Sequence, residues 1–162
     1  MLDAALELFV EKGFASTRAE EVAQRAGVSK GTLYLYYPSK EELFKAVIVR
    51  SLTSRIADTA QQVQAWDGAM APLLESLLVQ WWQQTYASPA SGVFKILIAE
   101  VRNFPEIAGY YVQQVIEPGS ALIGSIIARG IGSGEFRAVD VESTVHSLVL
   151  PMVMLCVHKH GL

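Results

Sequence analysis

The chain has 162 residues, of which 51% are hydrophobic and 18% charged, so it can bury a sizeable core and is not a disordered chain. Its net charge of -3 argues against a protein that coats DNA through bulk positive charge. Residues 1–55 hold eight basic and seven acidic side chains, whereas residues 56–162 hold five basic and nine acidic ones. Any nucleic-acid surface is therefore expected in the amino-terminal part.

The composition also predicts a cytoplasmic protein. The only cysteine, Cys156, cannot form a disulfide within one chain, and the expected role of its thiol is that of a small buried hydrophobe. Asp3 and Glu7 lie where a secretory signal would need basic and apolar residues. The longest apolar run, near residues 145–157, is expected to be too short to span a bilayer, so no membrane partner is expected.

The spacing of apolar residues predicts helices along almost the whole chain, and therefore an all-α fold. A first helix over residues 2–12 is expected to end at Gly13. Thr17, followed three residues later by Glu20, predicts a capping box that opens a second helix. This second helix stops at Gly27, a residue that favours helix ends.

A third and a fourth helix follow directly. Ser29 can cap a helix over residues 30–37, which Pro38 breaks. Ser39 can cap the fourth helix, and no helix breaker follows until about Trp66. At 1.5 Å per residue an unbroken helix of this length would reach roughly 39 Å. It is expected to connect two parts of the protein.

A second set of helices is expected in the rest of the chain. Their predicted spans are residues 72–86, 93–103 and 104–131, with a bend at Pro118, and a last helix that Asp140 caps and that runs to about residue 158.

Residues 20–40 have the layout of a helix-turn-helix. Ala23 is small enough for two short helices to cross closely, and Gly27 can adopt the backbone angle that the turn requires. Leu33 and Tyr37 lie on one side of the third helix and are expected to anchor it in the core. The opposite side of that helix is then free to meet a partner.

The outward side of the third helix has small, hydroxyl-bearing and apolar groups, and the sequence places no acid on it. Tyrosine and threonine hydroxyls can donate to phosphates, Leu35 can touch a thymine methyl, and Lys30 can reach a guanine edge or a phosphate. Lys40 and the free N–H groups at the start of the fourth helix suit a phosphate. Taken singly, Tyr34 and Tyr36 could equally be packing residues, and Lys40 a solvated lysine. The combination favours DNA.

Four segments carry a resemblance to a known family: 4-AALELF-9, 11-EKGF-14, 22-VAQRAGVSKGTLY-34 and 36-YYPSKEEL-43. Together they resemble the amino-terminal domain of the TetR family of repressors over residues 1 to about 50. The remainder resembles that family only in the number and order of its helices. The resemblance implies a homodimer whose two third helices enter the major groove of a palindromic double-stranded operator.

Carried onto this sequence, the resemblance implies these DNA-facing residues: Thr17, Lys30, Gly31, Thr32, Tyr34, Leu35, Tyr36 and Lys40. Family members often have a polar or aromatic residue where Leu35 stands. They also usually carry a basic arm before the first helix and one more helix after the last, which would lie outside residues 1–162. The resemblance divides the chain into a helix-turn-helix head, residues 1–39, and a ligand-binding and dimerisation body, residues 40–162. The helix over residues 40–66 links the two.

A small-molecule effector is expected in the body, because aromatic side chains crowd it while polar groups that could orient a ligand are few. The predicted effector is apolar or aromatic, and its binding should release the operator. The candidate ligand-binding residues are Trp66, Trp82, Phe94, Glu100, Phe104 and Tyr110. For each aromatic residue alone, a place in the core is the simpler interpretation.

The last helix is apolar nearly all round, so it needs cover on more than one side. We expect it to form half of a four-helix bundle in a homodimer, through Val145, Leu148, Val149, Met152 and Leu155.

The sequence does not suggest an enzyme, a cofactor or a metal site. His158 and His160 point to different sides of a helix, and no nucleophile, base or phosphate-loop pattern is present. The alternative to a ligand-responsive repressor is a dimeric small-molecule binding protein without operator binding. Acidic residues beside Lys30 and Tyr34 would favour that alternative.

Overall fold

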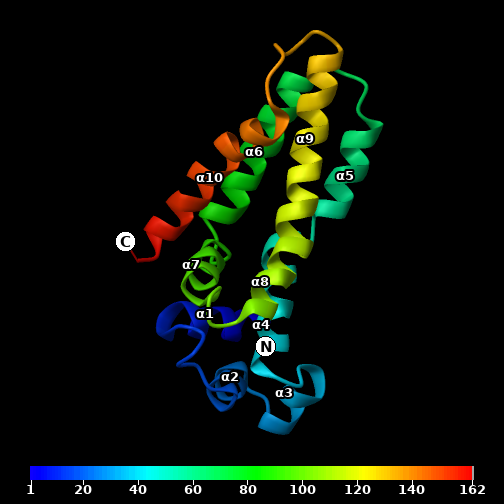
Figure 1. Cartoon of the computed structure of the whole chain (residues 1–162). Coiled ribbons are helices and arrows are strands. Elements are labelled where there is room, and N and C mark those ends of the chain that lie inside the picture. The colour runs from blue at the N-terminus through cyan, green and yellow to red at the C-terminus, as the bar shows by residue number, and fades with distance from the viewer. Residues whose placement is uncertain (162) are drawn as a thin grey trace.

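The computed structural model describes residues 1–161 and confirms an all-α fold, with no strand in those residues. Figure 1 shows a small group of helices at one end and longer helices above it. In chain order the elements are α1 (Leu2–Lys12), α2 (Ala19–Ala26), α3 (Lys30–Tyr36), α4 (Lys40–Ile48), the π-helical turn η1 (Val49–Thr53), α5 (Ile56–Ala65), α6 (Met70–Tyr86), α7 (Ser91–Glu100), α8 (Pro105–Tyr111), the π-helical turn η2 (Val112–Ile116), α9 (Glu117–Gly132) and α10 (Val141–Lys159).

The helix boundaries of the head follow local sequence signals. Gly27 ends α2 with a φ of 70°, in the left-handed region. The Ser29 hydroxyl accepts the Thr32 N–H at 3.0 Å, and the Ser39 hydroxyl accepts the Glu42 N–H at 3.1 Å, so both predicted caps are confirmed.

The predicted cap of α2 is wrong by one residue. Arg18 is the N-cap, and its N–H donates to the Glu21 carboxylate at 3.1 Å. Thr17, the predicted cap, is instead buried. The pattern Thr17–Glu20 and the pattern Arg18–Glu21 have the same spacing, and the burial of Thr17 selects the second.

The core of the head continues into the body. Phe9, Phe14 and Phe44 pack with ring centroids 5.2 to 5.3 Å apart, and Phe104 meets Phe14 edge-on at 4.8 Å. Buried residues of α7 and α8 belong to the same apolar cluster. Packing therefore shows no gap at the predicted boundary after residue 39.

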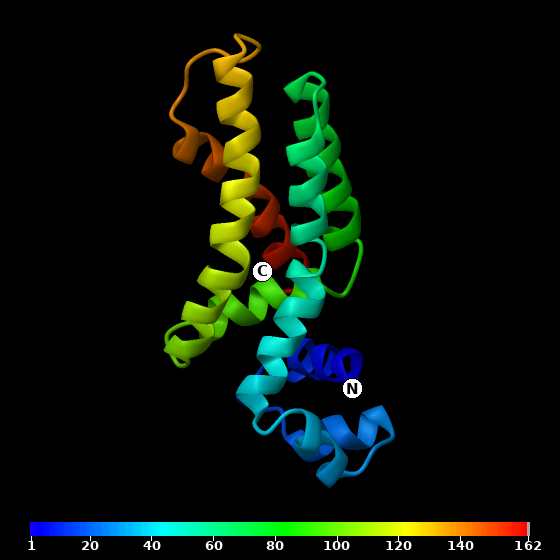
Figure 2. The same cartoon turned by 90° about the vertical axis from the view of Figure 1, so that its right-hand side faces the viewer.

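The predicted unbroken helix over residues 40–66 is wrong. It consists of α4, the π-helical turn η1, a turn at Ser54–Arg55, and α5 (Figure 2). A second π-helical turn, η2, separates α8 from α9 just before Pro118, close to the predicted bend, and η1 and η2 contact each other. π-helical turns can kink a helix, and residues 40–66 contain no Gly or Pro, so the sequence carried no helix-breaking residue that would reveal the break.

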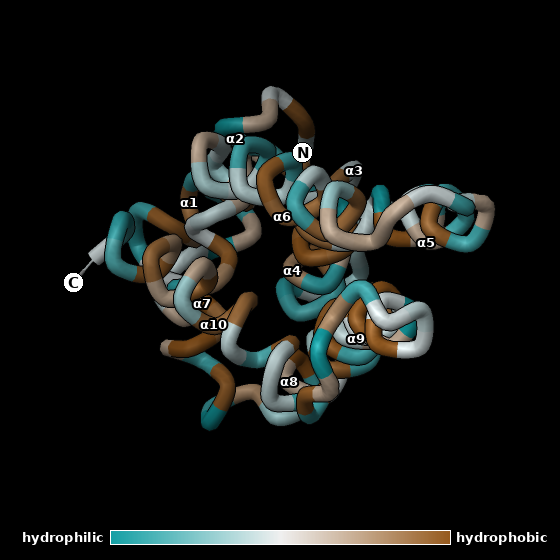
Figure 3. The backbone as a smooth tube through the Cα atoms, turned by 90° about the horizontal axis from the view of Figure 1, so that it is seen from above, coloured by the Kyte–Doolittle hydropathy of each residue, from teal (hydrophilic) through white to brown (hydrophobic). Residues whose placement is uncertain are grey.

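Figure 3 shows the helices of the body from above, with α5 and α9 on one side of the view and α7 and α10 on the other. Two apolar clusters hold them together: one joins α5, α6 and α9, and the other joins α9 and α10 with partly buried residues of α6. The Glu135 carboxylate accepts the N–H groups of Met70 and Ala71 at 2.7 and 2.8 Å, which caps α6. Burial also confirms the expected role of Cys156 as a small hydrophobe.

α10 is exposed on much of its surface. Its 19 residues are long and apolar enough to cross a membrane by length and composition, so the expectation that this segment is too short is wrong. Only 17% of it is buried within the chain. Its inward side packs on the body, whereas Leu150, Met154 and Leu155 are each about half exposed on its outward side.

Candidate nucleic-acid interface and ligand cavity

α3 lies at the end of the molecule with its outward side open to solvent (Figure 1). Leu35 is 80% exposed and Tyr36 is 63% exposed, and Tyr34 is also exposed. On the opposite side Leu33 is buried and Tyr37 packs against the core of the head, as predicted. Because one side of α3 is anchored in the core, a row of apolar and hydroxyl-bearing side chains projects from its other side.

Gly31 and Thr32, two further predicted DNA-facing residues, lie in the first turn of α3. Gly31 is exposed, and a methyl group added to it would meet only the Ser29 hydroxyl, at 3.9 Å. The Thr32 hydroxyl lies 2.8 Å from the Ser29 hydroxyl, so Thr32 also stabilises the start of the helix.

The expectation that this face has no acid nearby is wrong in three dimensions. The Lys30 ammonium pairs with the Glu20 carboxylate of α2 and lies 5.7 Å from the centre of the Tyr34 ring. Hydrogen bonding to Lys30 lowers the pKa of Glu20, and the same bond raises the pKa of Lys30. Arg25 is likewise held by Glu11 of α1 at 2.8 Å. Neighbouring helices thus partly neutralise the basic stretch seen in the sequence.

Lys40 and Thr17 form bonds inside the head. The Lys40 ammonium donates to the carbonyl oxygens of Phe14, Ala15 and Thr17 at 2.8, 3.2 and 3.1 Å, and lies over the Phe14 ring at 4.6 Å. The buried Thr17 hydroxyl can donate to the carbonyl oxygens of Gly13, at 2.8 Å, or Leu8, at 3.2 Å. Phosphate contacts by these two side chains would first require these bonds to break.

Arg18 is a cation that the sequence analysis missed. It is exposed at the start of α2, and within residues 1–161 its guanidinium makes no ion pair. Its position as N-cap could not have been found from spacing alone, because Thr17–Glu20 has the same spacing and threonine is the commoner N-cap residue.

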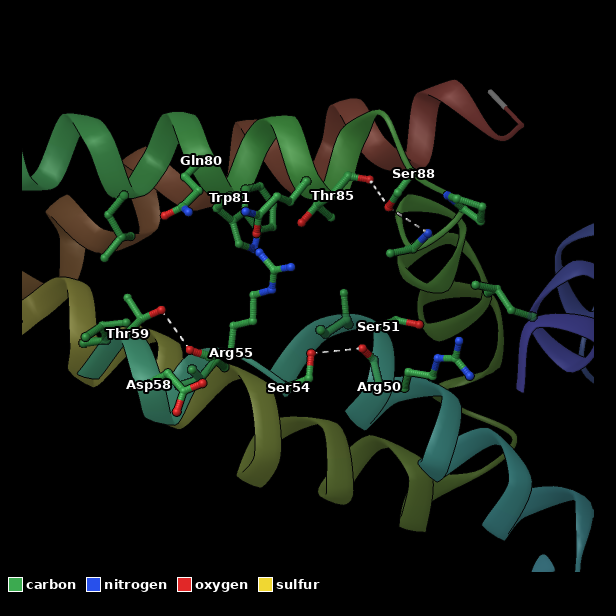
Figure 4. A pocket seen from close by; sticks show the side chains of 18 of the residues that line it. Arg50, Ser51, Ser54, Arg55, Asp58, Thr59, Gln80, Trp81, Thr85 and Ser88 are labelled. Atoms are coloured by element: carbon green, nitrogen blue, oxygen red, sulfur yellow. Dashed lines mark hydrogen bonds between the residues drawn. The ribbon is translucent and has the colours of Figure 1, made fainter. Parts of the chain in front are cut away.

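The body holds a cavity of about 560 Å³ between the η1–α5 segment and the second half of α6. Figure 4 shows Arg55 reaching from the break between η1 and α5 toward Trp81 of α6. Asp3 and Leu6 of α1 and the turn before α7 also line the cavity, so the head and the body both border it. Most of its polar lining consists of hydroxyl and amide side chains, namely Ser51, Ser54, Thr59, Gln62, Gln80, Gln84, Thr85 and Ser88.

None of the six predicted ligand-binding residues lines this cavity. They are occupied elsewhere, because aromatic side chains at helical spacing serve the packing of the body. Trp82 stacks on Tyr86 and Phe94 is buried beside Trp81.

The other four predicted residues are placed by contacts within the chain. Trp66 donates its indole N–H to the Ala69 carbonyl at 3.0 Å, and Phe104 packs in the head. Glu100 accepts a hydrogen bond from the Asn103 side chain at 3.0 Å, and the Tyr110 ring faces the Lys45 ammonium at 5.6 Å.

The predicted dimer residues divide between the two sides of α10. Val145 is buried, and Leu148 and Val149 pack against the same cluster, so all three serve the interior of this chain. Met152 is half-buried and Leu155 is exposed. When a helix is apolar on all sides, its sequence does not indicate which side packs against its own chain.

No group of three His, Cys, Asp or Glu side chains that could hold a metal ion occurs among residues 1–161.

The projecting α3, the turn at Gly27 and the buried residues that support both form a helix-turn-helix, a motif that DNA-binding proteins use. The model of the family described as bacterial regulatory proteins, tetR family, matches residues 1–47. Over 155 residues the chain is 27% identical to YfiR of Bacillus subtilis, an uncharacterized HTH-type transcriptional regulator, which covers 94% of this chain and 74% of the relative. The amino-terminal part of the chain is thus similar to the tetR family of bacterial regulatory proteins, and its similarity to YfiR extends over most of the chain.

Solved structures have the same fold. The TetR family transcriptional regulator PfmR from Thermus thermophilus aligns with a TM-score of 0.76 at 20% identity, over 98% of this chain and 93% of that one. FadR from Bacillus subtilis, solved in complex with stearoyl-CoA, aligns with a TM-score of 0.76 at 18% identity, over 97% of this chain and 83% of that one.

Proposed function

We propose that the chain is a repressor that binds a palindromic operator as a homodimer and leaves it when a small molecule binds the body. The observation that carries operator binding is the exposed outward side of α3, formed by Gly31, Tyr34, Leu35 and Tyr36. Such a row fits the major groove, where apolar groups meet thymine methyls and hydroxyls meet phosphates.

Arg18 and Lys30 supply the positive charge of this proposed interface. Lys30 exchanges its bond with Glu20 for one with a phosphate or a base edge, and Arg18 needs to release no ion partner. Thr17 and Lys40 hold the turn between α1 and α2 and position α3 rather than touch DNA through their side chains.

Dimerisation uses the outward stripe of α10, that is Leu150, Met154 and Leu155. Leu150 and Met154 lie one turn apart on one side of the helix and Leu155 flanks Met154, and an exposed apolar surface of this kind needs a cover in water. A second copy of the helix provides that cover. The proposed interface keeps Leu155 of the predicted one and leaves out Val145, Leu148 and Val149, which pack inside this chain.

The cavity beside η1 is the proposed effector site. It borders α1 of the head, the break in the linking segment and α6 of the body. A ligand that prefers one arrangement of this break would change the separation of the two heads and so their fit to half-sites one helical turn apart. The FadR structure with bound stearoyl-CoA supports small-molecule binding by this fold.

The proposed function is regulatory rather than catalytic, and it places the protein in the cytoplasm with DNA, without a membrane partner. The pairing of Lys30 with Glu20 favours one competing function, a dimeric ligand-binding protein that no longer binds an operator.

Selection of fragments from the organism's own genomic DNA separates these two functions. We expect enrichment of fragments that share an inverted repeat, and a Tyr36→Ala variant that binds them more weakly by about 1–3 kcal/mol per half-site at fixed salt. Absence of any enriched sequence, with the protein folded and dimeric, would favour the ligand-binding protein.

A further inference from the structure

Arg55 is exposed to solvent and lines the cavity. Its guanidinium points from the turn after η1 into the cavity, toward Trp81 and the neighbouring Gln80 (Figure 4). Within residues 1–161 it forms no ion pair, and its side chain donates no hydrogen bond. An arginine placed in this way has five N–H donors available to a carboxylate, phosphate or sulfonate.

The acids near the cavity do not neutralise Arg55. Asp3 is engaged with Arg50, whose Nη2 atom lies 3.0 Å from Asp3 Oδ1. Asp58 is one helical turn beyond Arg55 and points away from Trp81 (Figure 4). Asp3 and Asp58 also line the cavity, so the charge that reaches toward Trp81 comes from Arg55 alone and not from a net positive lining.

The other residues that line the cavity suit the uncharged part of a ligand that carries an acidic group. Trp81 is half-buried and contributes an aromatic surface, and Leu77 and Leu122 lie nearby on α6 and α9. Hydroxyl and amide side chains, which can donate and accept, line the cavity from both α6 and the η1–α5 segment. A pocket with one charged anchor, an aromatic surface and several neutral polar groups orients a small ligand.

We propose that the effector is a small organic anion whose acidic group pairs with Arg55 and whose uncharged part lies along Trp81. This inference rests on the proposed function, in which the cavity is the effector site. It replaces the expectation of an effector that is merely apolar or aromatic. Arg55 lies in the turn that breaks the linking segment after η1, so an anion that binds its guanidinium acts on the connection between head and body.

Two dyes with the same aromatic body test the charge requirement. The anion 8-anilinonaphthalene-1-sulfonate carries a sulfonate, and N-phenyl-1-naphthylamine is its neutral counterpart. Fluorescence titration of the full chain is expected to give a Kd for the anion at least ten-fold lower than for the neutral dye. Arg55→Gln is expected to weaken the anion about ten-fold, which is about 1.4 kcal/mol, and to leave the neutral dye unchanged.

Control variants separate charge at this site from charge elsewhere. Arg137→Gln removes an exposed arginine of the α9–α10 loop, outside the cavity, and should bind both dyes as the parent does. Arg55→Lys keeps the charge and should keep most of the affinity for the anion. Dye that binds the exposed side of α10 adds the same background to all variants.

Equal binding of the two dyes by the parent, or an Arg55→Gln variant that binds the anion like the parent, would overturn the anion proposal. Circular dichroism checks that the variant folds, and if it does not, the comparison of the two dyes on the parent decides alone. Gel shifts with selected operator DNA on the same samples test the proposed function separately. Operator binding with no anion preference refutes only this inference, whereas an anion site without operator binding refutes only the repressor.

Discussion

Replacing Lys40 with methionine tests whether this lysine holds the head together or contacts DNA. The change keeps most of the apolar stem and removes the ammonium that binds three carbonyl oxygens of the α1–α2 turn. The bonds to Phe14 and Thr17 are partly buried, whereas the bond to Ala15 is exposed, so water can replace it.

The expected loss of stability follows from the two partly buried hydrogen bonds. A hydrogen bond to a charged group contributes about 1.5–3 kcal/mol, and carbonyls that regain some water lose less than the full amount. We therefore expect Lys40→Met to lower the free energy of unfolding of the head by about 2–4 kcal/mol. Lys12→Met is the control, because Lys12 forms a surface pair with Glu21 that is worth about 0–1 kcal/mol.

Urea unfolding and operator binding, measured on the same variants, give the answer. At low temperature and without urea, where the folded state of Lys40→Met dominates, its operator affinity should fall less than ten-fold. An unfolding free energy within about 0.5 kcal/mol of the parent, together with lost operator binding, would refute the structural role and identify Lys40 as a phosphate contact.

Three further variants test the remaining parts of the account. Gly92→Ala places a methyl group against Val10 of α1, so it should lower the free energy of unfolding by about 1–3 kcal/mol in a thermal melt. Val10→Ala in the same chain should restore most of that stability, and no recovery would contradict the contact between α1 and α7. Glu20→Gln releases Lys30, so DNA binding should strengthen and its salt dependence should steepen by about one counterion per head; an unchanged slope in anisotropy titrations would count against that pairing. Met154→Glu should yield folded monomers in sedimentation velocity, and a persisting dimer would exclude the outward stripe of α10 as the interface.

The sequence predicted the head well because its signals are local. Ser29 and Ser39 cap helices that begin at the next residue, and Gly27 takes a left-handed angle that few other residues tolerate. The spacing of Leu33 and Tyr37 then determines which side of α3 is buried. The exposure of Leu35 and Tyr36 follows from the same spacing.

The electrostatics of the head could not be predicted in this way. Glu20 is ten residues from Lys30 and on another helix, and Glu11 is fourteen residues from Arg25. These pairs arise from how α1, α2 and α3 pack. A stretch without acids in the sequence therefore acquired acidic neighbours in space.

The cavity was missed for a related reason. The aromatic residues of the body predicted a ligand site, but most of them pack in the apolar clusters, as Phe94 and Phe104 do. The cavity lies where the linking segment breaks, and the apolar stripe continues through that break. Arg55 lines this cavity, and only the structure shows that it makes no ion pair within residues 1–161.

Footprinting of a selected genomic fragment tests the central claim most directly, namely that the outward side of α3 reads DNA. The parent should protect two inverted half-sites whose centres are about one helical turn apart on one face of the duplex, as two copies of α3 require. Leu35→Glu should abolish the protection without changing helical content or dimerisation. Undiminished protection by Leu35→Glu, or protection of a region without paired half-sites, would contradict the account.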